Sequence, residues 1–164
     1  LVGLVAYTEY FKGLPGAGNA LVAYLGGSTF LFGAAAVGQV VDGVVLFLLA
    51  ALSTFGREVI KDVEDVEGDA AEGLNTLPIA IGERRALLVA AAAILVAVLA
   101  SPVPFIRGVF GLPYLAFVLP ADAIMLTAAW RSADEPRVGH EWLKYGMFLA
   151  AFAFIAGRVS VLLG

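Results

Sequence analysis

The sequence predicts an all-α membrane protein, a bundle of transmembrane helices. Of its 164 residues, 61% are hydrophobic and only 15% are charged, whereas a soluble domain is roughly half apolar and about a quarter charged. One globular core of this size cannot bury so much apolar surface, so lipid must surround much of the chain. The 19 glycines also suit a bilayer, where small residues let helices pack closely. Lipid-exposed strands would need a closed barrel with an alternating pattern, which the sequence lacks.

Five apolar stretches are long enough to cross a hydrocarbon core, which takes about 20 helical residues. In chain order they are 20–40, 44–60, 86–100, 112–130 and 142–163. Asp42 and Gly43 predict a turn between the first two, and Pro102 and Pro104 end the third. The second stretch runs unbroken into a polar segment, and Gly68, Gly73 and Pro78 predict a loop after it.

The chain begins with Leu1 inside a further apolar stretch, 1–8, which predicts the end of a truncated helix. We therefore expect about five complete spans plus part of a sixth. We also expect one transmembrane domain over 1–164 that lacks its N-terminal part.

Composition excludes several classes of site. Without cysteine there is no disulfide framework and no thiolate metal centre, and a single histidine, His140, excludes a His-rich metal cluster. A formal net charge of −4 argues against nucleic acid as a partner, because nucleic-acid binding needs a basic surface.

The basic residues predict the orientation in the membrane. Eight of the ten fall on the same side as the acidic segment after the second span: Lys12, Arg57, Lys61, Arg84, Arg85, Arg131, Arg137 and Lys144. Only Arg107 and Arg158 fall on the other side. By the positive-inside rule, the acidic segment is cytoplasmic, and we expect a multi-pass protein of the cell membrane.

The acidic segment carries the candidate chemistry. Asp62, Asp65 and Asp69 follow one another at i, i+3 and i+7, so on a regular helix they share about one sixth of the circumference. Glu58 falls on the same face, and Glu64 points away from it. Stacked carboxylates repel one another and need a cation. Mg²⁺ takes oxygen ligands and bridges carboxylates to substrate phosphates.

A solvated acidic loop is the alternative explanation of this segment. Two observations favour a magnesium–diphosphate site. The aspartates continue a membrane helix, which places them at the mouth of a cavity at the interface. Cations also lie on that side, and carboxylates and cations around one opening suit a metal-bound diphosphate; they are Lys12, Arg57, Lys61, Arg84 and Arg85.

The run REVIKDVEDVEGDAAEGLNTLPIAIG, 57–82, resembles the second aspartate-rich motif of the UbiA superfamily of intramembrane prenyltransferases. The flanking TLPI, the upstream AYTEYFKGLPGAGN and the STFLFG that follows it resemble more narrowly the branch that makes archaeal ether lipids. The resemblance covers the whole chain in order. It implies a nine-helix fold in which two aspartate-rich motifs face one cavity and hold Mg²⁺ on a prenyl diphosphate.

Carried over residue by residue, the resemblance assigns Asp62, Asp65 and Asp69 to the metal and to catalysis. Lys12 and Tyr7 match a Tyr/Lys pair that contacts diphosphate or acceptor, although the spacing here is one residue longer. Asn75 stands where a basic residue is common, which puts one phosphate contact in doubt.

Three further residues are candidates for substrate or diphosphate binding. Arg57 and Lys61 are cations beside the motif. Asn19 is the third candidate, and the alternative is that it serves as the N-cap of the following helix.

The reaction that the resemblance implies is Mg²⁺-dependent transfer of a geranylgeranyl group from geranylgeranyl diphosphate to the lipid-phosphate acceptor geranylgeranylglyceryl phosphate. An aromatic acceptor from a quinone, chlorophyll or haem pathway is one alternative. A segment of a cation-coupled transporter is another, although it would place acids at mid-membrane depth. Because the first aspartate-rich motif is absent, we expect the isolated chain to be inactive.

Asp122 lies inside a predicted span and is either functional or a partner for another polar group or for the backbone near Pro120. Phe30, Phe32, Phe47 and Phe55 either line a prenyl tunnel or pack against lipid and helices.

Near the last predicted loop, Trp130 and Trp142 are expected to anchor the interface. We expect His140, in the same loop, to be a surface residue.

Overall fold

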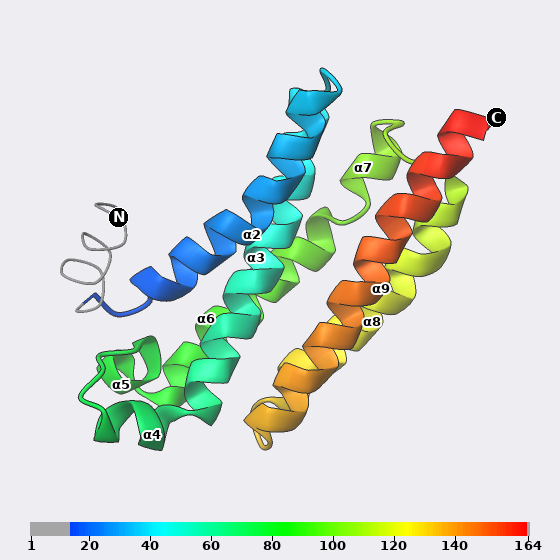
Figure 1. The fold of residues 1–164 in the computed structure, drawn as a ribbon. Helices are drawn as coiled ribbons and strands as arrows, with labels where there is room; N and C mark the ends of the chain where they lie inside the picture. Colours follow the sequence, from blue (N-terminus) through cyan, green and yellow to red (C-terminus); the bar gives the residue numbers. More distant parts are fainter. Residues whose placement is uncertain (1–13, 164) are drawn as a thin grey trace.

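The computed structural model describes residues 14–163 (Figure 1). Five long helices in that part are apolar enough to cross a membrane, which confirms the five predicted spans. They are α2 (Ala17–Ala36), α3 (Val40–Glu64), α6 (Glu83–Ala100), α8 (Leu112–Arg131) and α9 (Pro136–Leu163). Three short helices accompany them: α4 (Val66–Ala71), α5 (Leu77–Ile81) and α7 (Val103–Ile106). The partial span at 1–8, Tyr7 and Lys12 lie outside the described residues.

The long helices form two antiparallel pairs joined through α3 and α6. Helix α2 packs on α3, and α8 packs on α9, while α3 also contacts α6 and α9. Helices α4 and α5, the start of α2 and the connection from α8 to α9 gather at one end of the molecule, with α7 at the other (Figure 1). Helix α3 is therefore the element that links both pairs.

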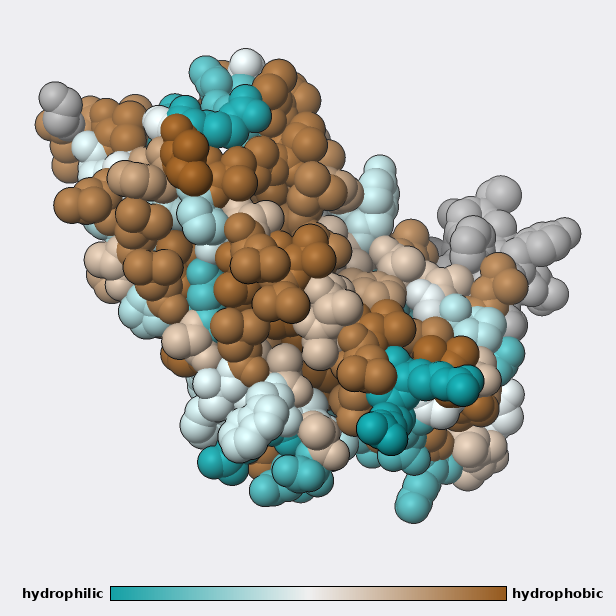
Figure 2. Space-filling model, turned by 180° about the vertical axis from the view of Figure 1, so that it is seen from behind, coloured by the Kyte–Doolittle hydropathy of each residue, from teal (hydrophilic) through white to brown (hydrophobic). Residues whose placement is uncertain are grey.

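Apolar side chains cover the middle of the bundle, and hydrophilic ones gather toward its ends (Figure 2). Only 17% to 33% of the residues in the most apolar window of each long helix are buried within the chain. Large hydrophobic residues such as Phe32 and Leu162 are instead exposed. This surface fits a bilayer, which solvates apolar side chains.

The turn between the first two spans lies at 37–39, where Gly38 adopts a φ of 73°. The predicted turn at Asp42 and Gly43 is therefore wrong, since both residues lie in the first turn of α3. Gly43 serves close packing: a Cβ there would collide with Ala34 of α2. Residues that are common in turns thus belong here to a helix, and the glycine allows α2 and α3 to pack closely.

Two other boundaries differ from the prediction. Helix α9 begins at Pro136, six residues before the predicted start of the last span, because Pro suits the first turn of a helix. The polar loop after the aspartates contains α4 and α5. Proline occupies the first turn of α5 also.

Candidate active site

Asp62 lies in the last two turns of α3 and is bound by a side chain from another helix. Asn19 Nδ2, in the first turn of α2, donates a hydrogen bond of 2.8 Å to Asp62 Oδ2. Asn19 is 8% exposed. The N-cap of α2 is Gly16, so the N-cap prediction for Asn19 is wrong. The amide instead fixes one carboxylate oxygen and leaves the other for a ligand.

The other two aspartates follow a break in the helix. Helix α3 ends at Glu64, Asp65 is the junction, and Asp69 lies in α4, so the expectation of one regular helix through all three is wrong. Like charges at this spacing destabilise a helix, which gives a physical reason for the break. Backbone bonds of 3.0 Å from Asp65 N to Lys61 O and of 2.9 Å from Asp69 N to Asp65 O continue the helical course.

Charge interactions link this acidic face. Asp69 and Glu58 are both close enough to Asp62 to interact with it electrostatically. Lys61 Nζ lies 3.0 Å from Asp65 Oδ2, a pair whose side chains are 44% and 47% exposed. At such exposure the pair contributes roughly 0–1 kcal/mol. We call Glu58, Asp62, Asp65 and Asp69 the acidic face of α3–α4.

The acidic face fits a hard divalent cation by the chemistry of its donors, which are carboxylate oxygens. Among residues 14–163, no three acidic or histidine side chains already converge on a point where an ion could sit. Mg²⁺ requires fewer: it keeps several waters and takes one or two carboxylates together with substrate phosphate oxygens. Asp62 and Asp69 can supply that number.

A cavity of about 450 Å³ lies between α2, α3, α6, α8 and α9. Ligand pockets of small molecules commonly measure about 300–1,000 Å³. Its walls are mostly apolar and aromatic. Its lining includes Gly26, Phe30, Leu49, Ala50, Ser53, Thr54, Arg57, Ala97, Ser101, Tyr114, Val118, Asp122, Met125, Lys144, Met147, Phe148, Ala150, Ala151 and Phe154.

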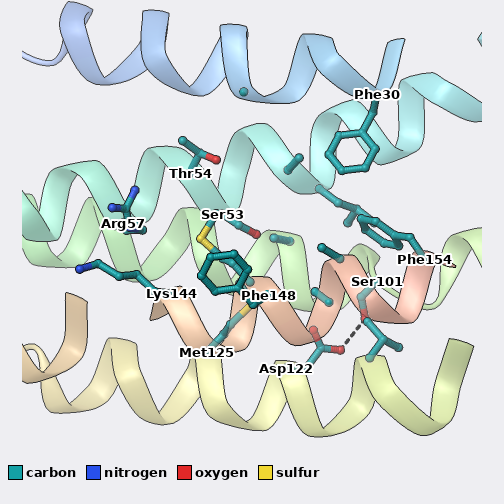
Figure 3. Close-up of a pocket in the computed structure, with 18 of the residues that line it drawn as sticks. Phe30, Ser53, Thr54, Arg57, Ser101, Asp122, Met125, Lys144, Phe148 and Phe154 are labelled. Carbon is teal, nitrogen blue, oxygen red and sulfur yellow. Dashed lines mark hydrogen bonds between the residues drawn. The ribbon is translucent and has the colours of Figure 1, made fainter. Parts of the chain in front are cut away.

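The ends of this cavity differ. Arg57 and Lys144 lie at one end of the close-up, and Phe30 and Phe154 at the other (Figure 3). None of Asp62, Asp65 and Asp69 lines it. Of the candidates for metal or diphosphate binding in the described part of the chain, only Arg57 borders the cavity, and its contact with Glu58 links the cavity to the acidic face.

Only some of the hydrogen-bond donors of Arg57 have a partner in this position. Its Nη1 lies 2.7 Å from Glu58 Oε1, whereas its Nε is buried and has no hydrogen-bond partner in the described part of the chain. An unsatisfied buried donor costs about 1–3 kcal/mol. A ligand oxygen at Nε would remove that cost.

His140 is buried, contrary to the prediction of a surface residue, being only 8% exposed. Its Nδ1 lies 3.1 Å from Glu64 Oε2, which ties the end of α3 to the start of α9. Glu64 does point away from the aspartates, as predicted. Its partner is 76 residues away in the sequence, a separation that no local pattern reveals. His140 Nε2 is buried without a partner in the described chain.

Asp122, in the middle of α8, has the polar partner that one reading of the sequence expected. Ser101 Oγ donates a 2.6 Å hydrogen bond to Asp122 Oδ2, and the Tyr114 hydroxyl donates one of 2.7 Å to the Ser101 carbonyl. These bonds connect the end of α6 with α8. All three residues also line the cavity, and Figure 3 shows the bond between Ser101 and Asp122.

The four phenylalanine candidates lie in different environments, and one of them lines the cavity. Phe30 lines the cavity, Phe32 is 81% exposed, Phe47 stacks edge-on against Tyr24, and Phe55 packs on the core.

The tryptophans flank the α8–α9 connection. Trp130 and Trp142 are exposed, and Arg131 lies 5.9 Å from the ring centroid of Trp142.

Lys144 was not predicted as a site residue and served only in the charge count. It lies four residues after His140, on the same face of α9. That spacing is the one sequence signal that could have found it.

Comparisons with known proteins show the family of this chain. The model of the UbiA prenyltransferase family matches residues 1–152. Digeranylgeranylglyceryl phosphate synthase of Haloquadratum walsbyi is 60% identical over 100% of this chain and 58% of its own length. The protein of that name from Methanopyrus kandleri is 46% identical, over 93% of this chain and 58% of its own length.

A solved structure from work on the biosynthesis of digeranylgeranylglyceryl phosphate synthase in membranes superposes with a TM-score of 0.86. It is 37% identical and covers 95% of this chain and 57% of its own. The chain thus spans 58% of the length of the curated relatives it matches. Since the family model matches nearly all of the residues, the chain belongs to the UbiA prenyltransferase family.

Proposed function

We propose that this protein transfers a geranylgeranyl group from geranylgeranyl diphosphate to geranylgeranylglyceryl phosphate, a step in the synthesis of archaeal ether lipids. The 60% identity to digeranylgeranylglyceryl phosphate synthases supports this choice of substrates. The observation that carries the proposal is the acidic face of α3–α4, anchored by the Asn19–Asp62 hydrogen bond, at one end of a bundle that encloses an apolar cavity.

Asp62 and Asp69 would hold Mg²⁺, with Asp65 as a further ligand. The bound ion supplies positive charge that neutralises the diphosphate leaving group. Asn19 fixes the orientation of Asp62, and Lys61 lies beside the site as a counter-charge for phosphate oxygens. Lys12 and Tyr7 belong to the same proposal as diphosphate or acceptor contacts.

The walls of the cavity protect the reacting carbon. As the bond from the allylic carbon to the diphosphate oxygen breaks, positive charge develops on the prenyl group. Apolar and aromatic side chains exclude water from it, and ring faces attract cations. The acceptor's hydroxyl oxygen then forms the new ether bond and loses its proton.

We further propose that the protein lies in the cell membrane with the acidic face on the cytoplasmic side. In the described part, Arg57, Lys61, Arg84, Arg85, Arg131, Arg137 and Lys144 belong to the same end of the bundle as that face. Arg107 belongs to the other end and lies 3.7 Å from Asp42. This asymmetry follows the positive-inside rule.

The test is an acceptor assay with the full-length protein in lipid vesicles. Radiolabelled geranylgeranyl diphosphate is supplied with Mg²⁺ and either geranylgeranylglyceryl phosphate or an aromatic acid acceptor. We expect a labelled dialkyl lipid phosphate from the first acceptor only. A labelled aromatic product would replace the lipid function with the aromatic one, and no transfer to either would remove both.

A further inference from the structure

Two cations from different helices meet at one end of the cavity. Arg57 comes from α3 and Lys144 from α9, and both line the same 450 Å³ space. Both are close enough to His140 to interact with it electrostatically. Figure 3 shows their charged groups at the end opposite Phe30 and Phe154.

Arg57 lies on a different side of α3 from Asp62. Arg57 and Asp62 are five residues apart, which corresponds to about 140° around a helix. The side of Asp62 faces α2 through Asn19, and the side of Glu64 faces α9 through His140. Arg57 and Glu64, seven residues apart, share the second side. The bundle therefore presents two polar sites, one acidic and one basic.

The basic site has hydrogen-bond donors that no side chain in the described residues engages. Arg57 Nε is buried without a partner in the described residues. Lys144 has no ion pair within 4.0 Å among them, while Glu64 and Glu58 are engaged by His140 and Arg57. Ser53 and Thr54, one turn before Arg57, add two hydroxyl groups to the same lining. The one acid in that lining, Asp122, is bonded to Ser101 farther along the cavity.

We propose that Arg57 and Lys144 bind the phosphate group of the acceptor lipid, whose hydrocarbon chain extends along the cavity toward Phe30 and Phe154. This assignment rests on the proposed function and divides its substrates between the two polar sites. The donor's diphosphate belongs to the acidic face, where carboxylates need a metal ion between them and an anion. The acceptor's phosphate carries about 1.5–2 negative charges at neutral pH and binds directly to guanidinium and ammonium groups.

The Glu64–His140 contact positions this second site. It joins α3 to α9, with Nδ1 3.1 Å from the carboxylate, and both cations are close enough to His140 to interact with it. The basic site therefore requires both helices in register.

The test measures the effect of a variant on the KM of the acceptor and on the KM of the donor separately, in the full-length protein. The main variant is Lys144→Met, since Lys144 is partly exposed, has no ion pair to lose, and keeps its chain length. Arg137→Gln is the matched control, because Arg137 is an exposed cation at the same end, in the same helix α9, and lies outside the cavity. We expect Lys144→Met to raise the KM for geranylgeranylglyceryl phosphate about tenfold, the effect of losing one charge-assisted contact. The KM for geranylgeranyl diphosphate should change less than twofold, and Arg137→Gln should change neither KM.

A binding measurement in EDTA gives a second readout that needs no turnover. The wild-type protein should bind geranylgeranylglyceryl phosphate without metal and about tenfold more tightly than the Lys144→Met variant does. The probe geranylgeranylglycerol, which lacks the phosphate, should bind both equally.

The outcomes keep the two proposals apart. A wild-type protein that transfers no prenyl group to the lipid phosphate defeats the proposed function. If transfer occurs but Lys144→Met raises the donor's KM instead, or changes neither KM, the division of substrates is wrong. Loss of wild-type binding in EDTA overturns it as well.

Discussion

Asp62, a metal ligand in the proposed mechanism, is held in place by a side chain from another helix. Its Oδ2 accepts from Asn19, a residue 43 positions earlier that is almost fully buried. A hydrogen bond to a charged group contributes about 1.5–3 kcal/mol. The bond also selects one rotamer of the carboxylate, so that binding an ion costs less ordering.

The first prediction concerns this contact. Asn19→Ala should raise the Mg²⁺ concentration needed for half-maximal transfer about tenfold, because the freed Asp62 side chain must be ordered on binding. Ser28→Ala, which removes an exposed side chain bonded to its own helix, should leave the requirement unchanged. A magnesium titration of initial rates measures both, and equal requirements in the two variants would show that the contact does not prepare the site.

At the scale of residues, the sequence predicted which side chains are candidates for the site better than it predicted the side chains that bond to them. Asp62, Asp65 and Asp69 stood out by spacing, and Arg57 by its place beside them. The partners Asn19 and His140 come from distant helices, so only the fold reveals them. His140 was misplaced for this reason: a lone histidine in a polar segment has no pattern that shows burial.

At the scale of elements, the five long helices were predictable because lipid leaves the backbone no alternative. Every buried N–H and C=O in hydrocarbon must be bonded within the segment. Helix ends were less predictable, since the start of α9 and the short helices α4 and α5 lie in polar segments where hydropathy carries no signal.

The second prediction tests how α3 is seated on α6. A Cβ at Gly56 would lie 2.7 Å from Ile94 Cγ1 and 3.0 Å from the Ala90 carbonyl oxygen. Gly56→Ala should therefore destabilise the protein by about 1–3 kcal/mol through overpacking.

Gly33→Ala is its control, because nothing lies within 4 Å of a Cβ there and alanine favours a helix. Thermal unfolding in detergent should show a lower midpoint for Gly56→Ala and no loss for Gly33→Ala. Equal midpoints would contradict the close contact of α3 with α6.

At the scale of the whole molecule, the topology gathers most of the basic residues at one end of the bundle. The acidic face, the basic site and the α8–α9 connection share one end of the bundle (Figure 1). The sequence predicted this grouping from the spans alone, since an error in the number of spans would have scattered the cations over both sides.

The third prediction is that this end faces the cytoplasm. The chain has no cysteine, so single cysteines report cleanly. Glu72→Cys, beside α4, should resist a membrane-impermeant maleimide in intact cells and react after lysis. Gln39→Cys, an exposed position at the other end, should react in intact cells, and the reverse pattern would invert the orientation.

The cavity itself could not be read from the sequence, because its lining is drawn from five helices. What the bundle as a whole offers is an acidic site and an apolar space close together in the membrane. In the proposed reaction, prenyl transfer at that junction depends on the acidic face.

The most direct test of the account is therefore Asp62→Ala combined with Asp65→Ala in the full-length enzyme. Magnesium-dependent transfer of a radiolabelled geranylgeranyl group should fall about a hundredfold or more, the scale of losing stabilisation of a developing charge. Glu67→Ala, which removes an exposed acid from the same segment, should retain the wild-type rate. Transfer at the wild-type rate by the double variant would contradict the account.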